Sequence, residues 1–264
     1  MSRAPAADPI ARIGRVFAII TALVCLTPLP LLLIVATSAV WQQGPWGQGF
    51  TLRWLAEGWR TVSPVAGNSL RLALVVLVID LAIGIPAAWL LARGRFRGQE
   101  LLRTLGVLPL AVPGIALALA LTLAYPTWRA GGWLLVGAHI IYTLPFLIGA
   151  LTPALARADL RERELVAATL GAGALRRLCF VVLPGVRGAL LAAAVLVLTL
   201  SLGEFNVSFF LFSPTAKTLP VDLYAAYITG RIEVAAATTV WFLVFIIPAA
   251  IAIERLGGAR TGQA

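Results

Sequence analysis

The sequence predicts an all-α membrane protein with six transmembrane helices. Sixty per cent of its 264 residues are hydrophobic and only 12% are charged, whereas soluble proteins carry about 25% charged residues. The apolar residues fall in blocks of roughly 20 residues, which is the length that one helix needs to cross a bilayer. We therefore expect one compact helical membrane domain and no second domain.

Six apolar blocks supply the predicted spans of a transmembrane domain at residues 16–253. The spans cover about 16–40, 68–92, 101–123, 133–155, 189–210 and 232–253. A polar, basic segment at 1–15 precedes the first block, as in a signal peptide. The block is longer than the 7–15 apolar residues of a signal peptide, so we interpret it as a retained span.

Two connections and two prolines interrupt this pattern. Residues 41–67, rich in Gly, Trp and Gln, are predicted to form a loop, and so are residues 211–231. Pro109 and Pro113 lie inside the third block. Each proline removes a backbone N–H donor, so we expect a kinked or locally opened helix there.

The distribution of basic residues predicts the orientation. With residues 1–15 and the tail at 254–264 in the cytoplasm, 15 of the 21 basic residues lie on the cytoplasmic side and six on the other. Cytoplasmic segments of membrane proteins carry such an excess. The sequence therefore predicts a multi-pass membrane protein with cytoplasmic termini. Because the Arg residues occupy short loops, they do not indicate a nucleic-acid surface.

Several kinds of chemistry find no support in the sequence. Lys217, the one lysine, lies in SPTAKTLP without the glycines of a phosphate-binding loop. His139 is the one histidine, and we interpret it as a packed residue that hydrogen-bonds inside the bundle, with metal ligation as the alternative. Cys25 and Cys179 suggest neither disulfides nor a metal cluster. We expect no catalytic residues, no metal and no cofactor.

Two carboxylates lie within predicted spans: Asp80 near the middle of the second and Glu204 in the outer part of the fifth. Such a group costs about 2.5–3.5 kcal/mol at the bilayer centre, so each should face the bundle interior or a cavity. Candidate residues of a translocation path are Asp80, Ser201, Glu204 and Asn206, the last three of which can open the fifth helix. The alternatives are structural hydrogen bonds, or an intramembrane enzyme that pairs the two acids, for which no motif is present.

The most charged stretch, residues 156–188, joins the fourth and fifth spans. Glu164–Leu170 contains good helix formers, and Gly171 and Gly173 supply a break where positive φ is cheap. A second helix follows, because apolar residues recur at i, i+3, i+4 and i+7. These residues are Leu175, Leu178, Cys179 and Val182. A helix–turn–helix with an apolar face and exposed Arg suits docking into a groove on a partner protein.

This stretch resembles the EAA loop of permease subunits in binding-protein-dependent ABC importers. That motif reads E-A-A, three residues, Gly, nine residues, Ile, one residue, Leu-Pro. The matching residues are Ala167, Gly171, Leu183 and Pro184, with Val181 in place of Ile. The N-terminal part of the motif is not matched, because Leu165 stands at the Glu position and Glu164 lies one place earlier.

Other stretches are similar to the same family: LPLAVPGIALALAL, GIPAAWLLAR and IIYTLPFLIGAL. The resemblance covers residues 68–253. It implies a subunit of the bacterial inner membrane that forms one of two membrane halves and is surrounded by lipid. ABC ATPase subunits would dock on the cytoplasmic loop, and a periplasmic binding protein would deliver the substrate. The implied ATPase-coupling residues are Glu164, Ala167, Ala168, Gly171, Leu175, Arg176, Leu178 and Pro184.

The substrate is the least determined feature. The segment GEFNVSFFLFSPTAKTLPVDLY is most similar to permeases of polyamine, aminoethylphosphonate and ferric-iron importers. Two acids near the predicted path suit a cation, so we favour a polyamine. Aminoethylphosphonate or another small anion, or ferric iron, are the alternatives. A membrane scaffold that recruits a soluble protein without a substrate path is the alternative from a different class.

Overall fold

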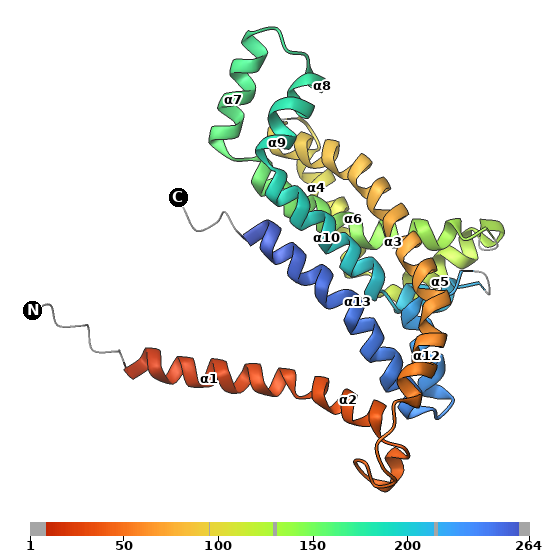
Figure 1. Cartoon of the computed structure of the whole chain (residues 1–264). Coiled ribbons are helices and arrows are strands. Elements are labelled where there is room, and N and C mark those ends of the chain that lie inside the picture. The colour runs from red at the N-terminus through yellow and green to blue at the C-terminus, as the bar shows by residue number, and fades with distance from the viewer. Residues whose placement is uncertain (1–8, 95, 129–130, 214–215, 259–264) are drawn as a thin grey trace, which may run out of the picture. The chain divides into compact units, whose positions relative to one another are not determined.

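The computed structural model describes residues 9–94, 96–128, 131–213 and 216–258, and within these ranges it consists of helices without a named strand (Figure 1). The all-α prediction is confirmed. The elements are α1 (Pro9–Leu26), α2 (Pro28–Thr37), η1 (Trp41–Gln43), α3 (Arg53–Arg93), α4 (Gln99–Val107), η2 (Leu108–Ala111), α5 (Gly114–Ala124), η3 (Pro126–Trp128), α6 (Trp133–Leu155), α7 (Ala158–Thr169), α8 (Ala174–Arg177), η4 (Leu178–Val182), α9 (Leu183–Gly185), α10 (Arg187–Gly203), α11 (Asn206–Leu211), α12 (Leu219–Ile228) and α13 (Ile232–Gly258). Residues 1–8 and 259–264, which belong to the predicted tails, lie outside the described residues.

The predicted single domain divides into two compact units. The smaller unit combines Met1–Arg60 with Ala226–Trp241, and the larger combines Thr61–Ala225 with Phe242–Ala264. The smaller unit has a core of small and branched residues from α2 and α13. Its buried members are Val35, Ala36, Ala236 and Ala237. Such small residues let helix backbones approach closely.

Within the described residues, three helices are long and apolar enough to cross a membrane: Ile13–Thr37, Arg53–Arg93 and Trp133–Leu155. The last coincides with the predicted fourth span. Its residues form one uninterrupted helix because Pro145 and Pro153 are accommodated within α6. These helices confirm a multi-pass membrane protein.

Two further apolar segments are bent. Gln99–Ala111 and Gly114–Ala124 meet at 101°, and Ala174–Gly185 and Arg187–Gly203 meet at 83°. Counting each pair as one span gives up to five spans. The first bend falls at η2 and Pro113, so the predicted opening of the third block is confirmed.

Both predicted loops contain helix, and the loop predictions are wrong there. In the first, α3 begins at Arg53, because apolar residues on this stretch are buried, among them Val62 at 0% exposure. In the second, α12 occupies residues 219–228. Its start is fixed by Leu219, which is buried and whose N–H donates to the Ser69 hydroxyl at 2.8 Å.

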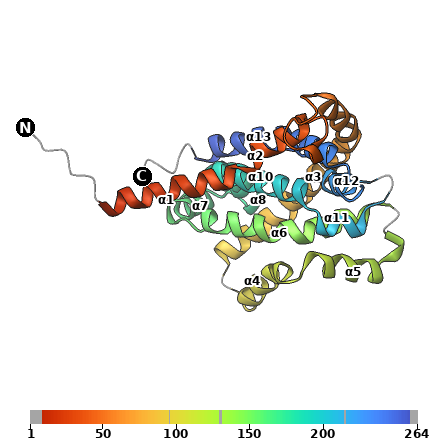
Figure 2. The same cartoon turned by 90° about the horizontal axis from the view of Figure 1, so that it is seen from below.

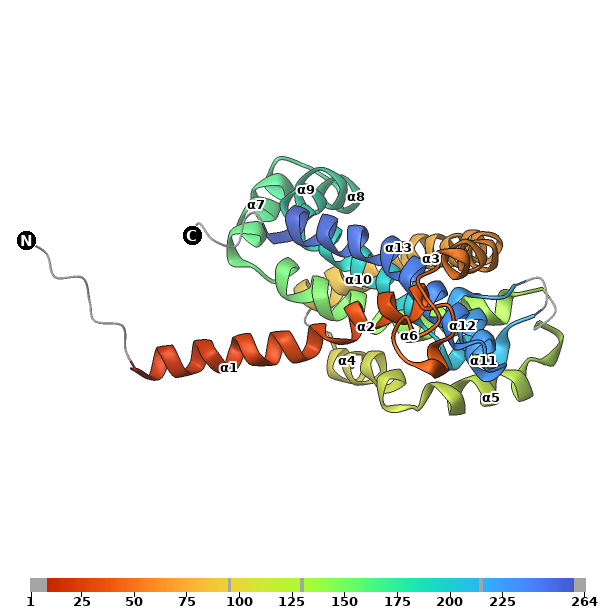
Figure 3. The same ribbon diagram turned by 60° about the horizontal axis from the view of Figure 1, so that its bottom comes forward.

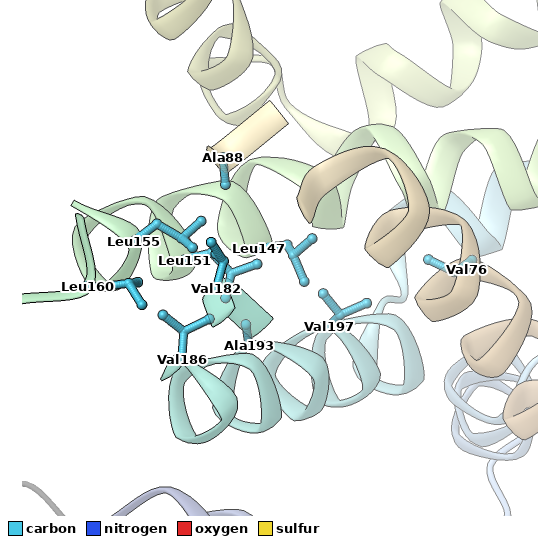
Figure 4. Packing of buried hydrophobic residues seen from close by; sticks show 10 residues of the cluster. All are labelled: Val76, Ala88, Leu147, Leu151, Leu155, Leu160, Val182, Val186, Ala193 and Val197. Atoms are coloured by element: carbon cyan, nitrogen blue, oxygen red, sulfur yellow. The ribbon is translucent and has the colours of Figure 1, made fainter. Parts of the chain in front are cut away.

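The larger unit is organised around α6, which packs along α10. Its main core joins α3, α6, α10 and the segment between α6 and α10 (Figure 4). The buried residues are Val76, Ala88, Leu147, Leu151, Leu155, Leu160, Val182, Val186, Ala193 and Val197. Gly84 permits the approach of α3 to α6, because a Cβ there would lie 2.2 Å from Leu147 Cδ2.

The predicted fifth span is also opened. α10 ends at Gly203 and α11 begins at Asn206, so the helix is interrupted at Glu204 as the polar residues indicated. α11 packs against α5 and α6, and Figure 2 shows these three helices side by side. The break therefore lies in the interior of the helical unit.

Candidate coupling segment and translocation path

The coupling segment, residues 156–188, gathers α7, α8 and α9 at one end of the larger unit (Figure 3). α7 ends in a Schellman motif, in which a left-handed residue closes the helix. Gly171 has φ +82° and its N–H donates to the Ala168 carbonyl at 3.0 Å. The Ala172 N–H donates to the Ala167 carbonyl at 3.0 Å. The predicted helix break at Gly171 is thus present.

The second half of the segment differs from a regular helix. α8 leads into η4, a π-helical turn, before α9 ends at Gly185. A π turn shifts the register of the side chains. Val182 is fully buried and Leu178 half-buried, but Leu175 and Cys179 are exposed. The prediction of one continuous apolar face is therefore wrong.

Five large apolar side chains of the coupling segment are more than half exposed. They are Leu165, Val166, Leu170, Leu175 and Phe180. Leu170, at 82%, and Phe180, at 78%, are the most exposed of the five. Large exposed apolar side chains that gather on a charged segment are typical of interaction sites. We call these five residues the apolar tip.

Glu164 points the other way. It is only 7% exposed, and Arg93 Nε donates to its Oε2 at 2.8 Å. Trp89 Nε1 lies 3.4 Å from the same oxygen, and Arg93 Nη1 donates to the Leu155 carbonyl. We call this contact between α3, α6 and α7 the Arg93–Glu164 clamp. The carboxylate of this predicted coupling residue is engaged inside the chain.

The other predicted coupling residues occupy different surroundings. Ala167 and Ala168 are half-buried and supply carbonyls to the Schellman motif. Arg176 and Pro184 are exposed. Only some of the predicted set is therefore presented to solvent, and the sequence did not distinguish these residues from the buried ones.

A buried polar network lies between α3, α6, α10 and α11. The Thr143 hydroxyl donates to Asp80 Oδ2 at 2.6 Å and lies 2.8 Å from the carbonyl oxygen of His139. The two ring nitrogens of His139 lie 2.9 Å from the Ser201 and Ser208 hydroxyl oxygens. His139 is thus a packed, hydrogen-bonded residue, as interpreted. Among the described residues no cluster of His, Cys, Asp or Glu fits a metal ion.

The Glu204 carboxylate caps the start of α11. Its carboxylate accepts hydrogen bonds from the N–H groups of Val207 and Ser208 at 2.9 Å each. The first N–H groups of a helix have no partner within the helix, so this carboxylate acts as a cap. Glu204 is 6% exposed, whereas Asn206 is exposed. Asp80 and Glu204 therefore hold different partners and do not form a catalytic pair.

The openings of the third and fifth blocks lie together. A Cβ built at Gly114, the first residue of α5, would lie 3.2 Å from the Asn206 Cβ and 3.8 Å from Glu204 Oε1. Thr143 and Ser208 were not predicted to belong to the buried polar network around His139. The spacing of His139 and Thr143, four residues apart on one helix face, was the available signal.

Comparison with known proteins agrees with this architecture. The family model described as "Binding-protein-dependent transport system inner membrane component" matches residues 81–259. The provisionally named 2-aminoethylphosphonate transport system permease protein PhnV of Salmonella typhimurium is 28% identical over 241 residues, covering 89% of this chain and 90% of PhnV. The spermidine/putrescine transport system permease protein PotC of Escherichia coli K12 is 29% identical over 245 residues, covering 89% and 92%. The chain therefore belongs to the family of binding-protein-dependent transport system inner membrane components, the permeases of ABC importers.

Proposed function

We propose that this chain forms half of the substrate path of an ABC importer and receives mechanical work through its coupling segment. The observation that carries the proposal is the two-sided character of that segment. The apolar tip is exposed, while Leu160 and Val182 of the same segment belong to the core of the larger unit. A separate ATPase would supply the groove that covers the tip.

Force on the segment has a direct route into the membrane helices. Leu160 and Val182 pack in one cluster with Leu155 of α6 and Ala193 of α10. The Arg93–Glu164 clamp also connects the coupling segment to the end of α3 that we place in the cytoplasm. Closure of two ATPase subunits would move these helices together, and rocking of one membrane half against another gives alternating access.

The proposed topology has six spans with both termini in the cytoplasm. The bent pair α4–α5 supplies the third span. α10, continued by α11 after the break at Glu204, supplies the fifth span, and α13 supplies the sixth. Fifteen basic residues on the cytoplasmic side against six on the other support this orientation. A second permease subunit and a binding protein on the outer side complete the proposed importer.

Replacing an exposed side chain of the apolar tip tests this function. Phe180→Ala should weaken binding of the partner ATPase by at least about tenfold, since a buried aromatic anchor contributes about 2 kcal/mol or more. Leu123→Ala is the matched control, because Leu123 is equally exposed, at 83%, but lies on α5. Co-purification and ATP hydrolysis of the reconstituted complex would be measured.

The same experiment separates a transporter from a scaffold. A transporter requires ATP-dependent uptake of solute into proteoliposomes as well as ATPase docking. If the ATPase docks normally and no delivered solute is taken up, the scaffold is the better description. If Phe180→Ala and Leu123→Ala bind the ATPase equally well, the docking role of the tip is wrong.

The proposed path follows the paired helix openings and includes Asp80, Ser201, Glu204 and Asn206. Glu204→Ala should lower stability by about 0.5–2 kcal/mol through loss of the α11 cap and should reduce uptake. Glu204→Gln retains one acceptor and should do less of both. Glu100→Ala removes an exposed carboxylate and is the control. Thermal unfolding and uptake equal to that control in Glu204→Ala would exclude a role for the cap.

The hydrogen bonds of Asp80 and Glu204 remove the reason for preferring a polyamine as the substrate. The relatives are named for 2-aminoethylphosphonate and for spermidine/putrescine. The argument for a polyamine was the presence of two acids near the path. Because Asp80 and Glu204 already accept hydrogen bonds inside the bundle, they give a polyamine no advantage over an aminoethylphosphonate.

A further inference from the structure

A pocket of about 300 Å³ lies at the start of α6. Asn68 and Arg71 of α3 line one side, and Gly132 and Trp133 line the base. The segment before α12 supplies Lys217 and other residues. None of the described lining residues is acidic. The pocket thus combines two cationic side chains with hydrogen-bond donors.

The pocket lies at the opposite end of α6 from the coupling segment. α6 has 23 residues, which corresponds to about 34 Å at 1.5 Å per residue. The pocket is at Trp133, and the coupling segment follows Leu155. On α3, likewise, Arg71 lines the pocket and Arg93 belongs to the clamp. If the coupling segment faces the cytoplasm, the pocket faces the side from which substrate arrives.

The charges of the pocket favour an anion. Arg71 is exposed, and within the described part of the chain no carboxylate pairs with it. Lys217 forms an ion pair with Asp222 of α12, which holds the ammonium group at the pocket wall and offsets its charge. The net positive charge of the pocket therefore comes from Arg71. A guanidinium group presents planar pairs of donors that match the oxygens of phosphate and carboxylate groups.

Two uncharged features add donors. Gly132 caps α6 with φ +74° and has no side chain to satisfy the first N–H groups of the helix, which favour negative charge nearby. Thr218 also lines the pocket and is only 4% exposed, and its hydroxyl has no hydrogen-bond partner among the described residues. A buried polar group without a partner is unusual in a folded protein.

We propose that this pocket binds a small dissolved oxyanion of the phosphate or phosphonate type before it enters the translocation path. The inference rests on the proposed function and narrows its substrate to solutes with an anionic group. The volume lies at the lower end of the range of small-molecule sites, which suits a solute of a few non-hydrogen atoms. Arg71 is the principal anchor, and Lys217 and Thr218 complete the site.

The test uses methylphosphonate and inorganic phosphate as anionic probes and putrescine as the cationic probe. Binding to the purified complex of permease and ATPase subunits in a phosphate-free detergent would be measured by calorimetry. Arg71→Gln should weaken phosphonate binding at least about tenfold, since a charge-assisted hydrogen-bonding partner is lost. Arg60→Gln is the control, because Arg60 is also exposed on the proposed outer side and does not line the pocket.

Each outcome is decisive. Anion binding that Arg71→Gln weakens and Arg60→Gln leaves unchanged supports the site. Absence of anion binding, or preference for putrescine, overturns it. A repeat in nanodiscs with phosphatidylglycerol distinguishes a lipid headgroup, because displacement of methylphosphonate by that lipid would overturn the assignment to a dissolved substrate. Basal ATP hydrolysis is measured separately. It should be unchanged in the control Arg60→Gln, whereas a failure of the wild-type permease to engage the ATPase contradicts the proposed function instead.

Discussion

Glu164→Leu should uncouple ATP hydrolysis from uptake while leaving the exposed apolar tip in place. The substitution removes the partner of Arg93, whose side chain is only 15% exposed and whose Nη2 already lacks a partner among the described residues. Leaving one member of a buried ion pair without its partner costs about 3–5 kcal/mol. α7 would then lose its attachment to α3. We expect uptake per ATP hydrolysed by the reconstituted importer to fall at least tenfold.

A double-mutant cycle isolates the clamp from general damage. Arg93→Met should resemble Glu164→Leu, and the double variant should recover part of the loss, because an apolar pair can replace a buried ion pair at little cost. Asp159→Asn is the matched control. Asp159 lies on α7, as Glu164 does, and the substitution removes its exposed ion pair with Arg157, the residue before the helix. Such pairs contribute about 0–1 kcal/mol. If uptake per ATP hydrolysed were equal in Glu164→Leu and Asp159→Asn, the clamp would not transmit movement of α7 to α3.

The sequence predicted those features that depend on local pattern. The helix at 133–155 has the predicted bounds, because a long apolar block between Gly132 and a charged stretch favours one continuous helix. The break at Gly171 was predictable because few residues other than glycine adopt positive φ. The openings at Pro113 and Glu204 were indicated by residues that disrupt apolar helices.

Features that depend on contacts between distant residues were not predictable. Arg93 and Glu164 lie 71 positions apart, and no spacing rule pairs them. Both residues were expected in cytoplasmic segments, where a charged side chain normally faces water. Burial beside Arg93 and Trp89 of α3 gave Glu164 its internal role. The pocket at Arg71 likewise required three separate segments to be brought together.

Gly171→Pro should abolish coupling by breaking the turn between α7 and α8. Gly171 has φ +82°, whereas proline fixes φ near −65° and has no N–H to donate to the Ala168 carbonyl. The Schellman motif would lose one of its two hydrogen bonds and its left-handed residue together. The apolar tip spans this turn, with Leu170 before it and Leu175 after it. We expect loss of ATPase docking, measured by co-purification, and of ATP-dependent uptake.

A graded pair of alanine variants shows that backbone conformation is the cause. Gly171→Ala retains the N–H but places a Cβ in the left-handed region, which costs about 1–2 kcal/mol, so ATPase docking should weaken but persist. Gly173→Ala adds the same methyl group two residues later, at φ −65° and with no atom within 4 Å of the new Cβ. It should dock as the wild type does. If Gly171→Ala and Gly173→Ala dock equally, the left-handed turn does not set the geometry of the tip, and coupling must depend on the clamp and the core residues Leu160 and Val182 instead.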